Sequence, residues 1–354
     1  MTPLGKALKQ RIAATGPMSL GEYMAVCLSD PDHGYYTMRD PLGAAGDFTT
    51  APEISQMFGE LVGLCLAQTW LDSDAPPAFT LVELGPGRGT LMADLLRATR
   101  AVPGFHDALS LHLVETSPTL RAAQTNALPL PPTHHSSLAT VPDGPLFLVA
   151  NEFFDALPVR QFQRIEDRWR ERVVGLKDGA LTLGLTDPVP LALLEHRLGD
   201  TRDGDIVEVS QVAIGIAQEI GARIAQHGGL ALIVDYGGWR SLGDTFQAVQ
   251  DHRATDPLAE PGAADLTAHV DFEALGRAAS PAVTTEMIPQ GVFLERLGIT
   301  SRAQTLARAL NGDALETHIA AHRRLTHPDE MGTLFKAMAL VQAGAPFPAG
   351  FEET

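Results

Sequence analysis

A glycine-rich loop is the clearest sign of chemistry in this chain of 354 residues. The apolar run Phe79-Thr80-Leu81-Val82-Glu83 is typical of a buried strand, and Gly85, Gly87 and Gly89 follow it at alternate positions. Glycine has no Cβ and tolerates unusual backbone angles, so a ligand can approach the main chain closely at the N-terminus of the next helix. The pattern predicts a cofactor loop in which Glu83 and the three glycines bind the ligand.

The spacing of this loop separates classes of cofactor. A dinucleotide-binding loop has the pattern G-x-G-x-x-G. After Gly85 and Gly87, the position of its third glycine is occupied by Thr90. An acid just before the glycines disfavours a pyrophosphate and favours a positively charged amino-acid moiety. Glu115 ends the next apolar run, Leu111 to Glu115, where its carboxylate can accept both ribose hydroxyls of an adenosyl group. An ordinary strand-to-helix turn is the alternative for the loop alone, and the second acid favours a nucleoside-type cofactor.

Strands that alternate with helices must position these acids. Apolar strands are expected at 79–83, 111–115, 146–150 and 230–234, the last ending at Asp235, with helices near 90–100, 212–225, 266–278 and 303–324 and a final strand at 334–341. This order predicts an α/β protein with a mostly parallel, doubly wound sheet. Short β-like runs at 169–174 and 180–185, joined across Lys177-Asp178-Gly179, predict a β-hairpin inserted into the main sheet.

We divide the chain into four parts on this basis. Residues 1–76 are expected to form an N-terminal helical cap with a cofactor-covering loop, and residues 77–161 the first part of the α/β core. Residues 162–210 are expected to hold the hairpin and a substrate region, and residues 211–354 the rest of the core. Within the last part, 243–265 is expected to be a long loop, because Pro, Gly, Asp and Gln are too frequent there for a regular element.

Composition excludes several function classes. The formal net charge of −17 disfavours nucleic-acid binding, which needs clustered Lys and Arg, and mildly favours a cationic partner. No apolar stretch approaches the roughly 20 residues that span a bilayer. The two cysteines, Cys27 and Cys65, lie in apolar surroundings and are expected to be free, buried thiols in a reducing compartment. We therefore expect a bacterial cytoplasmic protein, and read Lys6, Lys9 and Arg11 as part of the fold rather than as a targeting peptide.

Several blocks spread over the chain resemble the MidA-like methyltransferases, a family that includes the mitochondrial arginine methyltransferase needed for assembly of respiratory complex I. The blocks are GDFTTAPEIS (46–55), VELGPGRGT (82–90), LHLVETSP (111–118), VANEFFDALP (149–158), LALIVDYGG (230–238) and the long segment 243–272. The resemblance implies a class I methyltransferase fold and S-adenosyl-L-methionine as cofactor. It also implies a protein substrate that carries arginine, such as a complex I subunit. A non-catalytic assembly factor that binds the cofactor, and a small-molecule methyltransferase, remain alternatives.

The resemblance also suggests where the acceptor binds. Glu152 resembles the first acid of the arginine methyltransferase acid loop, Gln161 stands where a second glutamate is usual, and Asp155 could replace it. A carboxylate can orient a guanidinium with bidentate hydrogen bonds and take its proton, although Glu152 or Asp155 could instead cap the following segment. Asn151 and His269 are further catalytic candidates, and Asn151 is also a cofactor candidate. Asp235 is either a pocket residue or a turn former.

The remaining candidates lie outside the sheet. The loop Gly46-Asp47-Phe48-Thr49 is expected to cover the methionine end of the cofactor because of its place in the family signature. His134 and His135 are adjacent rather than spaced as a metal pair on one helix face, so no metal site is expected. The sequence does not fix the oligomeric state.

Overall fold

The structure is a computed structural model that describes residues 2–38, 49–250 and 252–352. The chain forms two compact units, which we describe separately. Unit 1 consists of Met1–Phe48, Asp155–Ala213 and Gly238–Asp271, and unit 2 of Thr49–Phe154, Ile214–Gly237 and Phe272–Thr354. This division places the predicted 1–76 segment in both units, with the change at residue 48. In the described part of the chain, no helix has the length and apolar character that a membrane crossing requires.

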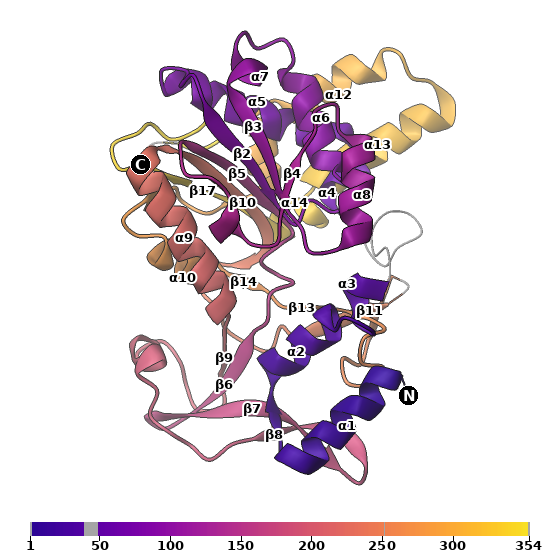
Figure 1. Cartoon of the computed structure of the whole chain (residues 1–354), viewed down its shortest axis with the longest axis vertical. Helices are drawn as coiled ribbons and strands as arrows, with labels where there is room; N and C mark the ends of the chain where they lie inside the picture. The colour runs from indigo at the N-terminus through magenta and orange to yellow at the C-terminus, as the bar shows by residue number, and fades with distance from the viewer. Residues whose placement is uncertain (1, 39–48, 251, 353–354) are drawn as a thin grey trace. The chain divides into compact units, whose positions relative to one another are not determined.

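Unit 2 contains the central sheet, whose strands run in the order β15-β17-β10-β5-β2-β3-β4, with β16 also paired to β17 (Figure 1). Its parallel strands are β2 (Phe79–Leu84), β3 (Leu109–Val114), β4 (Thr133–His135), β5 (Leu146–Asn151) and β10 (Gly229–Gly238). Strand β17 (Phe335–Val341) runs antiparallel to β10, and β15 (Val283–Thr284) and β16 (Ile288–Pro289) pair antiparallel with β17. The chain is therefore a mixed α/β protein: the predicted parallel strands are present, and β17 makes the sheet mixed.

Continuous apolar runs explain the central strands. Every residue of β2 and of β5 is buried, as expected for strands covered on both faces. The helices of unit 2 are α4 (Ala51–Ile54), α5 (Gln56–Asp72), α6 (Thr90–Thr99), α7 (Phe105–Ala108), α8 (Pro118–Ala127), α9 (Gln211–His227, which begins in unit 1), α10 (Phe272–Ala278), α11 (Gln290–Arg296), α12 (Ile299–Ala307), α13 (Gly312–Thr326) and α14 (Met331–Leu334).

Two helix predictions were wrong. The helix expected at 303–324 is two helices, because Asn311 has extended backbone angles and Gly312 has a φ of 53°, so the first helix cannot continue into α13. The helix expected from residue 266 begins only at Phe272, since Asp265–Thr267 forms the strand β13.

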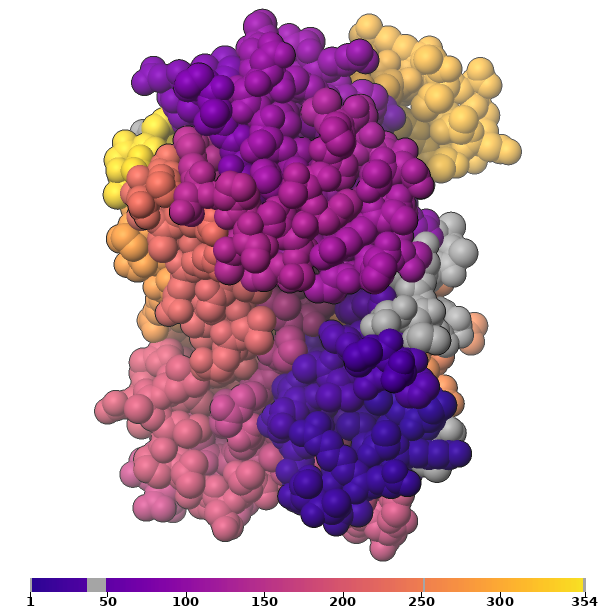
Figure 2. Space-filling model, in the orientation of Figure 1, coloured from indigo at the N-terminus to yellow at the C-terminus, as the bar shows by residue number. Residues whose placement is uncertain are grey.

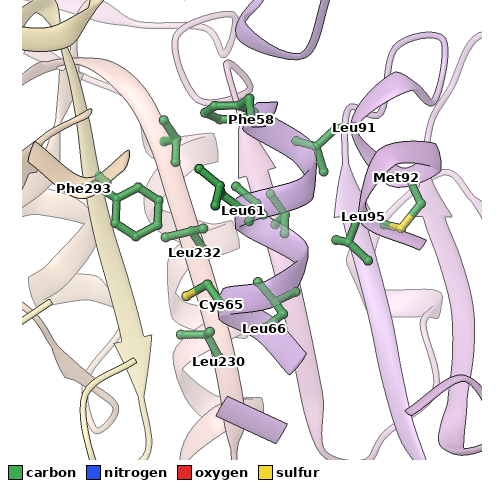
Figure 3. Packing of buried hydrophobic residues seen from close by; sticks show 14 of the residues in the cluster. Phe58, Leu61, Cys65, Leu66, Leu91, Met92, Leu95, Leu230, Leu232 and Phe293 are labelled. Carbon is green, nitrogen blue, oxygen red and sulfur yellow. The ribbon is translucent and has the colours of Figure 1, made fainter. Parts of the chain in front are cut away.

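Helices α5 and α6 pack against each other on one face of the sheet, where both belong to the main apolar core (Figure 3). Two glycines of α5 allow the close approach. A Cβ on Gly59 would lie 2.8 Å from Asp94 Cβ, and one on Gly63 would lie 2.9 Å from Leu95 Cα. Because α6 begins at the end of the glycine loop, this contact also determines where that loop lies.

Unit 1 is built around two small sheets and N-terminal helices. The helices are α1 (Pro3–Thr15), α2 (Leu20–Ser29) and α3 (Tyr35–Met38). The larger sheet has the order β1-β7-β6-β9 with β8 paired to β7, formed by β1 (Met18–Ser19), β6 (Arg160–Ile165), β7 (Arg168–Lys177), β8 (Ala180–Leu185) and β9 (Ile206–Val209). Figure 2 shows the N-terminal segment in indigo beside this region in pink, and α1 and α2 pack on β7.

The structure confirms the β-hairpin and corrects the long loop. Strands β7 and β8 pair across a turn at Asp178 and Gly179, which have φ values of 51° and 78°. The hairpin belongs to the unit 1 sheet rather than to the central sheet. Residues 243–265 are not a structureless loop, because β11 (Gln247–Gln250) and β12 (Arg253–Thr255) form a second small sheet with β13. Tyr23 Oη donates to the Pro257 carbonyl at 2.6 Å and holds this segment on α2.

The close approach of α5 to α6 leads to a prediction about stability. In Gly63→Ala the new Cβ would have to displace the backbone of α6, so we expect the free energy of unfolding to fall by about 1–3 kcal/mol. In the control Gly215→Ala, on α9, the new Cβ has no neighbour within 4 Å, and we expect unchanged or higher stability. Thermal and urea unfolding of both variants would check this; equal stabilities would contradict the packing argument.

Candidate functional site

The carboxyl ends of the parallel strands of unit 2 bring the predicted cofactor residues to one edge of the sheet. Strand β2 lies between β3 and β5, and the register pairs Glu83 with Leu113 on one side and with Val149 on the other. The chain leaves β2 toward β3, whereas it leaves β5 toward β10 on the opposite side. The ends of β2 and β5 therefore flank the point where strand order reverses, which is where open α/β sheets bind ligands.

The glycine loop has the conformation that its sequence predicts. Gly85, Gly87 and Gly89 have φ values of 61°, 53° and 84°, which side-chain-bearing residues rarely adopt. The Gly85 N–H donates to the Val114 carbonyl at 3.0 Å, and the Gly89 N–H donates to the Pro86 carbonyl at 2.8 Å. A Cβ on Gly85 would lie 2.9 Å from the ring of Phe153. The loop thus folds tightly between β2 and α6, and Phe153 packs where a Gly85 side chain would begin.

Glu83 is a buried acid at the end of β2. Its exposed fraction is 3%, and its Oε2 has no hydrogen-bond partner among the described residues. Burial raises the pKa of this carboxyl to about 8. A buried oxygen without a donor costs free energy that a ligand donor or cation would recover. Glu83 therefore suits a cationic ligand group.

Glu115 follows β3 and lies half-buried at the same edge. Its Oε1 accepts from the Ser117 N–H at 2.7 Å, and its own N–H donates to the His135 carbonyl at 2.9 Å. Burial raises its pKa, against the hydrogen bonds from the Ser117 and Thr116 N–H groups. Two carboxylate oxygens offer about four acceptor sites, so Glu115 can accept further hydroxyl donors.

The turn after β5 is shaped by Asp235, which lies three residues before the end of β10. Asp235 is fully buried, and its Oδ2 accepts from the N–H groups of Phe153 at 3.2 Å and of Phe154 at 2.9 Å. Its Oδ1 accepts from the Tyr236 N–H at 2.9 Å. The turn-former interpretation of Asp235 accounts for these contacts.

Within this turn Glu152 adopts a φ of 50°, an uncommon conformation for a residue with a side chain. Its Oε1 accepts from the Ala51 N–H at 2.8 Å and from Asn151 Nδ2 at 3.1 Å. Glu152 therefore caps a helix, but α4 rather than the segment that follows it in the chain. Helix α4 is also fixed at its other end, where Glu53 accepts from the Thr90 hydroxyl at the start of α6. Asn151 is 8% exposed, and its Oδ1 has no partner in the described part of the chain.

Asp155 and His269 belong to unit 1 and lie near each other there. The Asp155 carbonyl accepts from the Ala268 N–H at 3.0 Å, and the His269 N–H donates to Thr245 Oγ1 at 2.8 Å. Asp155 also lies near Tyr36, whose pKa is raised by burial and then by the charges of Asp265 and Asp155. The Tyr36 hydroxyl donates to Asp265 at 2.8 Å. The catalytic roles of these residues stay predictions.

Gln161, which stands where a second glutamate was considered, is a buried structural residue of unit 1. Its Nε2 donates to Glu208 at 2.6 Å and to Asp244 at 2.7 Å, and its Oε1 accepts from Arg172 at 2.8 Å. A glutamate here would place three carboxylates together, which explains why an amide is suited to this position.

The structure adds less about the remaining residues that were predicted from the sequence. Gly46, Asp47 and Phe48 lie outside the described residues, and Thr49 is a half-buried loop residue two positions before α4. Among the described residues, no group of three His, Cys, Asp or Glu side chains could hold a metal ion. Cys27 and Cys65 are free, buried thiols, as expected.

The sequence interpretation missed Gln124, which is fully buried on α8 and contacts both the glycine loop and Glu115. The sequence does contain a signal that could have identified this residue. Gln124 lies four residues after Leu120, so the two share the face of α8 that packs inward. A polar residue on that face must have buried partners.

Comparison with known proteins agrees with this geometry. A family model described as "Putative S-adenosyl-L-methionine-dependent methyltransferase" matches residues 61–288. The chain is 38% identical to the protein arginine methyltransferase NDUFAF7, mitochondrial, of Danio rerio, with 95% of this chain and 86% of the relative covered. It is 37% identical to the Homo sapiens protein of that name, with 96% and 84% covered. A crystal structure of a Burkholderia thailandensis protein bound to S-adenosyl-homocysteine is 28% identical, with a TM-score of 0.83 over 98% of this chain and 93% of that one.

The residues at the edge of the unit 2 sheet fit S-adenosyl-L-methionine. Glu83 offers a buried oxygen without a partner to the cationic amino-acid end, and Asn151 offers a second. Gly85, Gly87 and Gly89 place no side chain between a ligand and the main chain, and Glu115 retains acceptor sites for the ribose. The cofactor residues predicted from the sequence, as far as they are described and belong to unit 2, therefore all lie at its strand ends or in its loops.

Glu83 yields a prediction about pH. Between its ordinary pKa of 4.5 and its folded value of about 8, the folded protein holds a proton that the unfolded chain has lost. The free energy of unfolding therefore falls as pH rises through this window and levels off above pH 8. In Glu83→Gln that loss disappears, so we expect the melting temperature of the variant, relative to the original protein, to rise from pH 5 to pH 9. Calorimetric melting across this range, without ligand, would check it.

The same variant tests the ligand role. Glu83→Gln should bind S-adenosylhomocysteine at least 10-fold more weakly at pH 8.5, because an amide cannot pair with the ammonium group. A variant that is stabilised at high pH yet binds the ligand unchanged would show that Glu83 is buried but does not bind.

Proposed function

Because this chain belongs to the family of S-adenosyl-L-methionine-dependent methyltransferases, we propose that it methylates arginine side chains of a protein substrate. The observation that carries this proposal is the similarity, at 37–38% identity over 95–96% of the chain, to proteins named protein arginine methyltransferase. Glu83 near the end of β2 and Glu115 directly after β3 support the binding of a cofactor at that edge of the sheet.

We propose further that unit 2 is a class I methyltransferase fold. The support is the order of its strands, in which the antiparallel β17 lies between β10 and β15. Reversal of strand order at β2 and β5 is also typical of nucleoside-binding α/β sheets.

S-adenosyl-L-methionine supplies a methyl group bound to a positively charged sulfur. The task of the protein is then to align the acceptor nitrogen and to remove a proton from it, since a guanidinium is protonated in water. We propose that the Glu152 carboxylate orients the guanidinium and accepts this proton. Its φ of 50° and its contact with Ala51 hold the carboxylate in one place, as a positioning group requires. Asp155 and His269 are the alternative proton acceptors.

The physiological partner is part of the proposal. A subunit of respiratory complex I is the protein substrate that we expect, because the family resemblance implies it. We also propose that the reaction takes place in the bacterial cytoplasm, a reducing setting to which two free, buried thiols are suited. The measurement that decides the substrate is identification of the labelled protein.

The function is tested by incubating the protein with a bacterial lysate and methyl-labelled S-adenosyl-L-methionine, followed by mass spectrometry for methylarginine. We expect a labelled protein with the label on arginine. In Glu152→Gln, the amide oxygen can still accept from the Ala51 N–H, but the charge and the proton acceptor are lost. Labelling should therefore fall by about 100-fold or more, while S-adenosylhomocysteine binding measured by calorimetry is retained.

Each other outcome has a meaning. Labelled metabolites without labelled protein would replace the proposal with a small-molecule methyltransferase. Cofactor binding without any label would favour a non-catalytic assembly factor. Full activity of Glu152→Gln would leave Glu152 only its role as the cap of α4 and move the search for the base to Asp155 and His269.

A further inference from the structure

Gln124 ends in an amide that is completely buried within unit 2, and both the nitrogen and the oxygen of this amide have hydrogen-bond partners. Its Nε2 donates to the Gly87 carbonyl at 2.6 Å and lies 3.5 Å from Glu115 Oε2. Its Oε1 lies 2.8 Å from His134 Nε2. One side chain on α8 therefore contacts the glycine loop, the acid after β3 and strand β4.

The direction of each hydrogen bond follows from the amide. Both Nε2 protons point toward acceptors, so Oε1 is left to accept, and His134 must carry its proton on Nε2. Burial lowers the pKa of His134, which favours the neutral ring in this tautomer. The arrangement allows no flip of the amide, because a flipped Gln124 would bring its oxygen against the Gly87 carbonyl and the Glu115 carboxylate.

The contact with Gly87 also sets the orientation of a peptide group in the loop. Because the peptide bond is planar and trans, a Gly87 carbonyl directed at α8 turns the N–H of the next residue the opposite way. Gly87 has a φ of 53° and no side chain to restrict it, so this hydrogen bond supplies a constraint that its own backbone lacks. Gln124 also lies beside Gly89, since a Cβ added there would be 3.5 Å from Gln124 Cγ.

We propose that Gln124 is a positioning residue for the cofactor. Its amide joins the glycine loop to the ribose-binding carboxylate Glu115, so that both are held in place before the ligand binds. Gln124 has no role in the transfer step itself. The inference rests on cofactor binding by unit 2 and does not require that the methyl acceptor be arginine.

The first test compares variants by calorimetric titration with S-adenosylhomocysteine, after circular dichroism has shown that each is folded. Gln124→Met keeps the approximate volume but cannot donate, and we expect its Kd to rise by about 10- to 100-fold. The matched control is Thr125→Ala on the same helix, where an exposed hydroxyl bonded to the Arg121 carbonyl is removed and Kd should not change. His134→Phe removes only the outer partner of the amide, so its effect on Kd should be smaller than that of Gln124→Met.

A second test separates positioning from simple packing. In Gln124→Glu the side chain can donate to the Gly87 carbonyl only when it is protonated. Glu115 and His134 are the titratable groups that contact it, and Arg121 interacts with both of them. The ratio of variant to original Kd should therefore be near 1 at pH 5.5 and rise at least 10-fold by pH 8.5, because the ionised form repels both the Gly87 carbonyl and Glu115. A residue that only fills space would give a ratio that does not change with pH.

The proposal is overturned if Gln124→Met binds S-adenosylhomocysteine within twofold of the original protein, or if His134→Phe loses as much affinity as Gln124→Met. Failure of the original protein to bind the ligand at all would instead contradict cofactor binding by unit 2. A labelling experiment that finds no methylarginine would not affect the Gln124 result, so the two failures can be told apart.

Discussion

The binding edge of unit 2 depends on the burial of one carboxylate, Asp235. A fully buried carboxyl group needs hydrogen-bond partners, and those of Asp235 include three backbone N–H groups, two of them from the turn after β5. This requirement bends the chain sharply at the end of β5 and places Glu152 in its left-handed conformation. Glu152 then caps α4, and α4 is joined to the start of α6 through Glu53 and Thr90. The turn, the short helix and the glycine loop are thus linked through carboxylates.

The acids of this edge differ in what satisfies them, and that difference separates structural from ligand-binding roles. Asp235 accepts from several backbone donors, which is what a structural carboxylate needs. Glu83 is as deeply buried, yet its Oε2 has no donor among the described residues and its pKa is raised accordingly. Glu115 lies between these cases, since the Ser117 N–H occupies part of its capacity. Counting the donors around a buried acid therefore tells more about its role than its position at a strand end.

Sequence reasoning succeeded where one local signal determines the structure. The buried strands are continuous apolar runs, and the three alternate glycines are needed by a turn with positive φ at each of them. It failed where the partner is distant in sequence. Nothing local shows that Gln161 lies between Glu208 and Asp244, or that Glu152 caps a helix about 100 residues earlier in the chain. The strands β11 and β12 were missed because they are only three or four residues long among turn-forming residues.

Four of the six blocks that carry the family resemblance contain a place where the chain passes from one unit to the other, and one of them is the segment 243–272, with the passage after Asp271. Block 46–55 contains the passage after Phe48, block 149–158 the passage after Phe154, and block 230–238 the passage after Gly237. In block 149–158 one short segment contributes to both units: Asn151 to Phe154 form the turn on Asp235 in unit 2, and the next residue, Asp155, accepts from Ala268 in unit 1. A segment constrained in two units tolerates few side chains. This double constraint applies to block 149–158, whereas the glycine loop is built within unit 2 alone and depends on partners in that unit, such as Gln124.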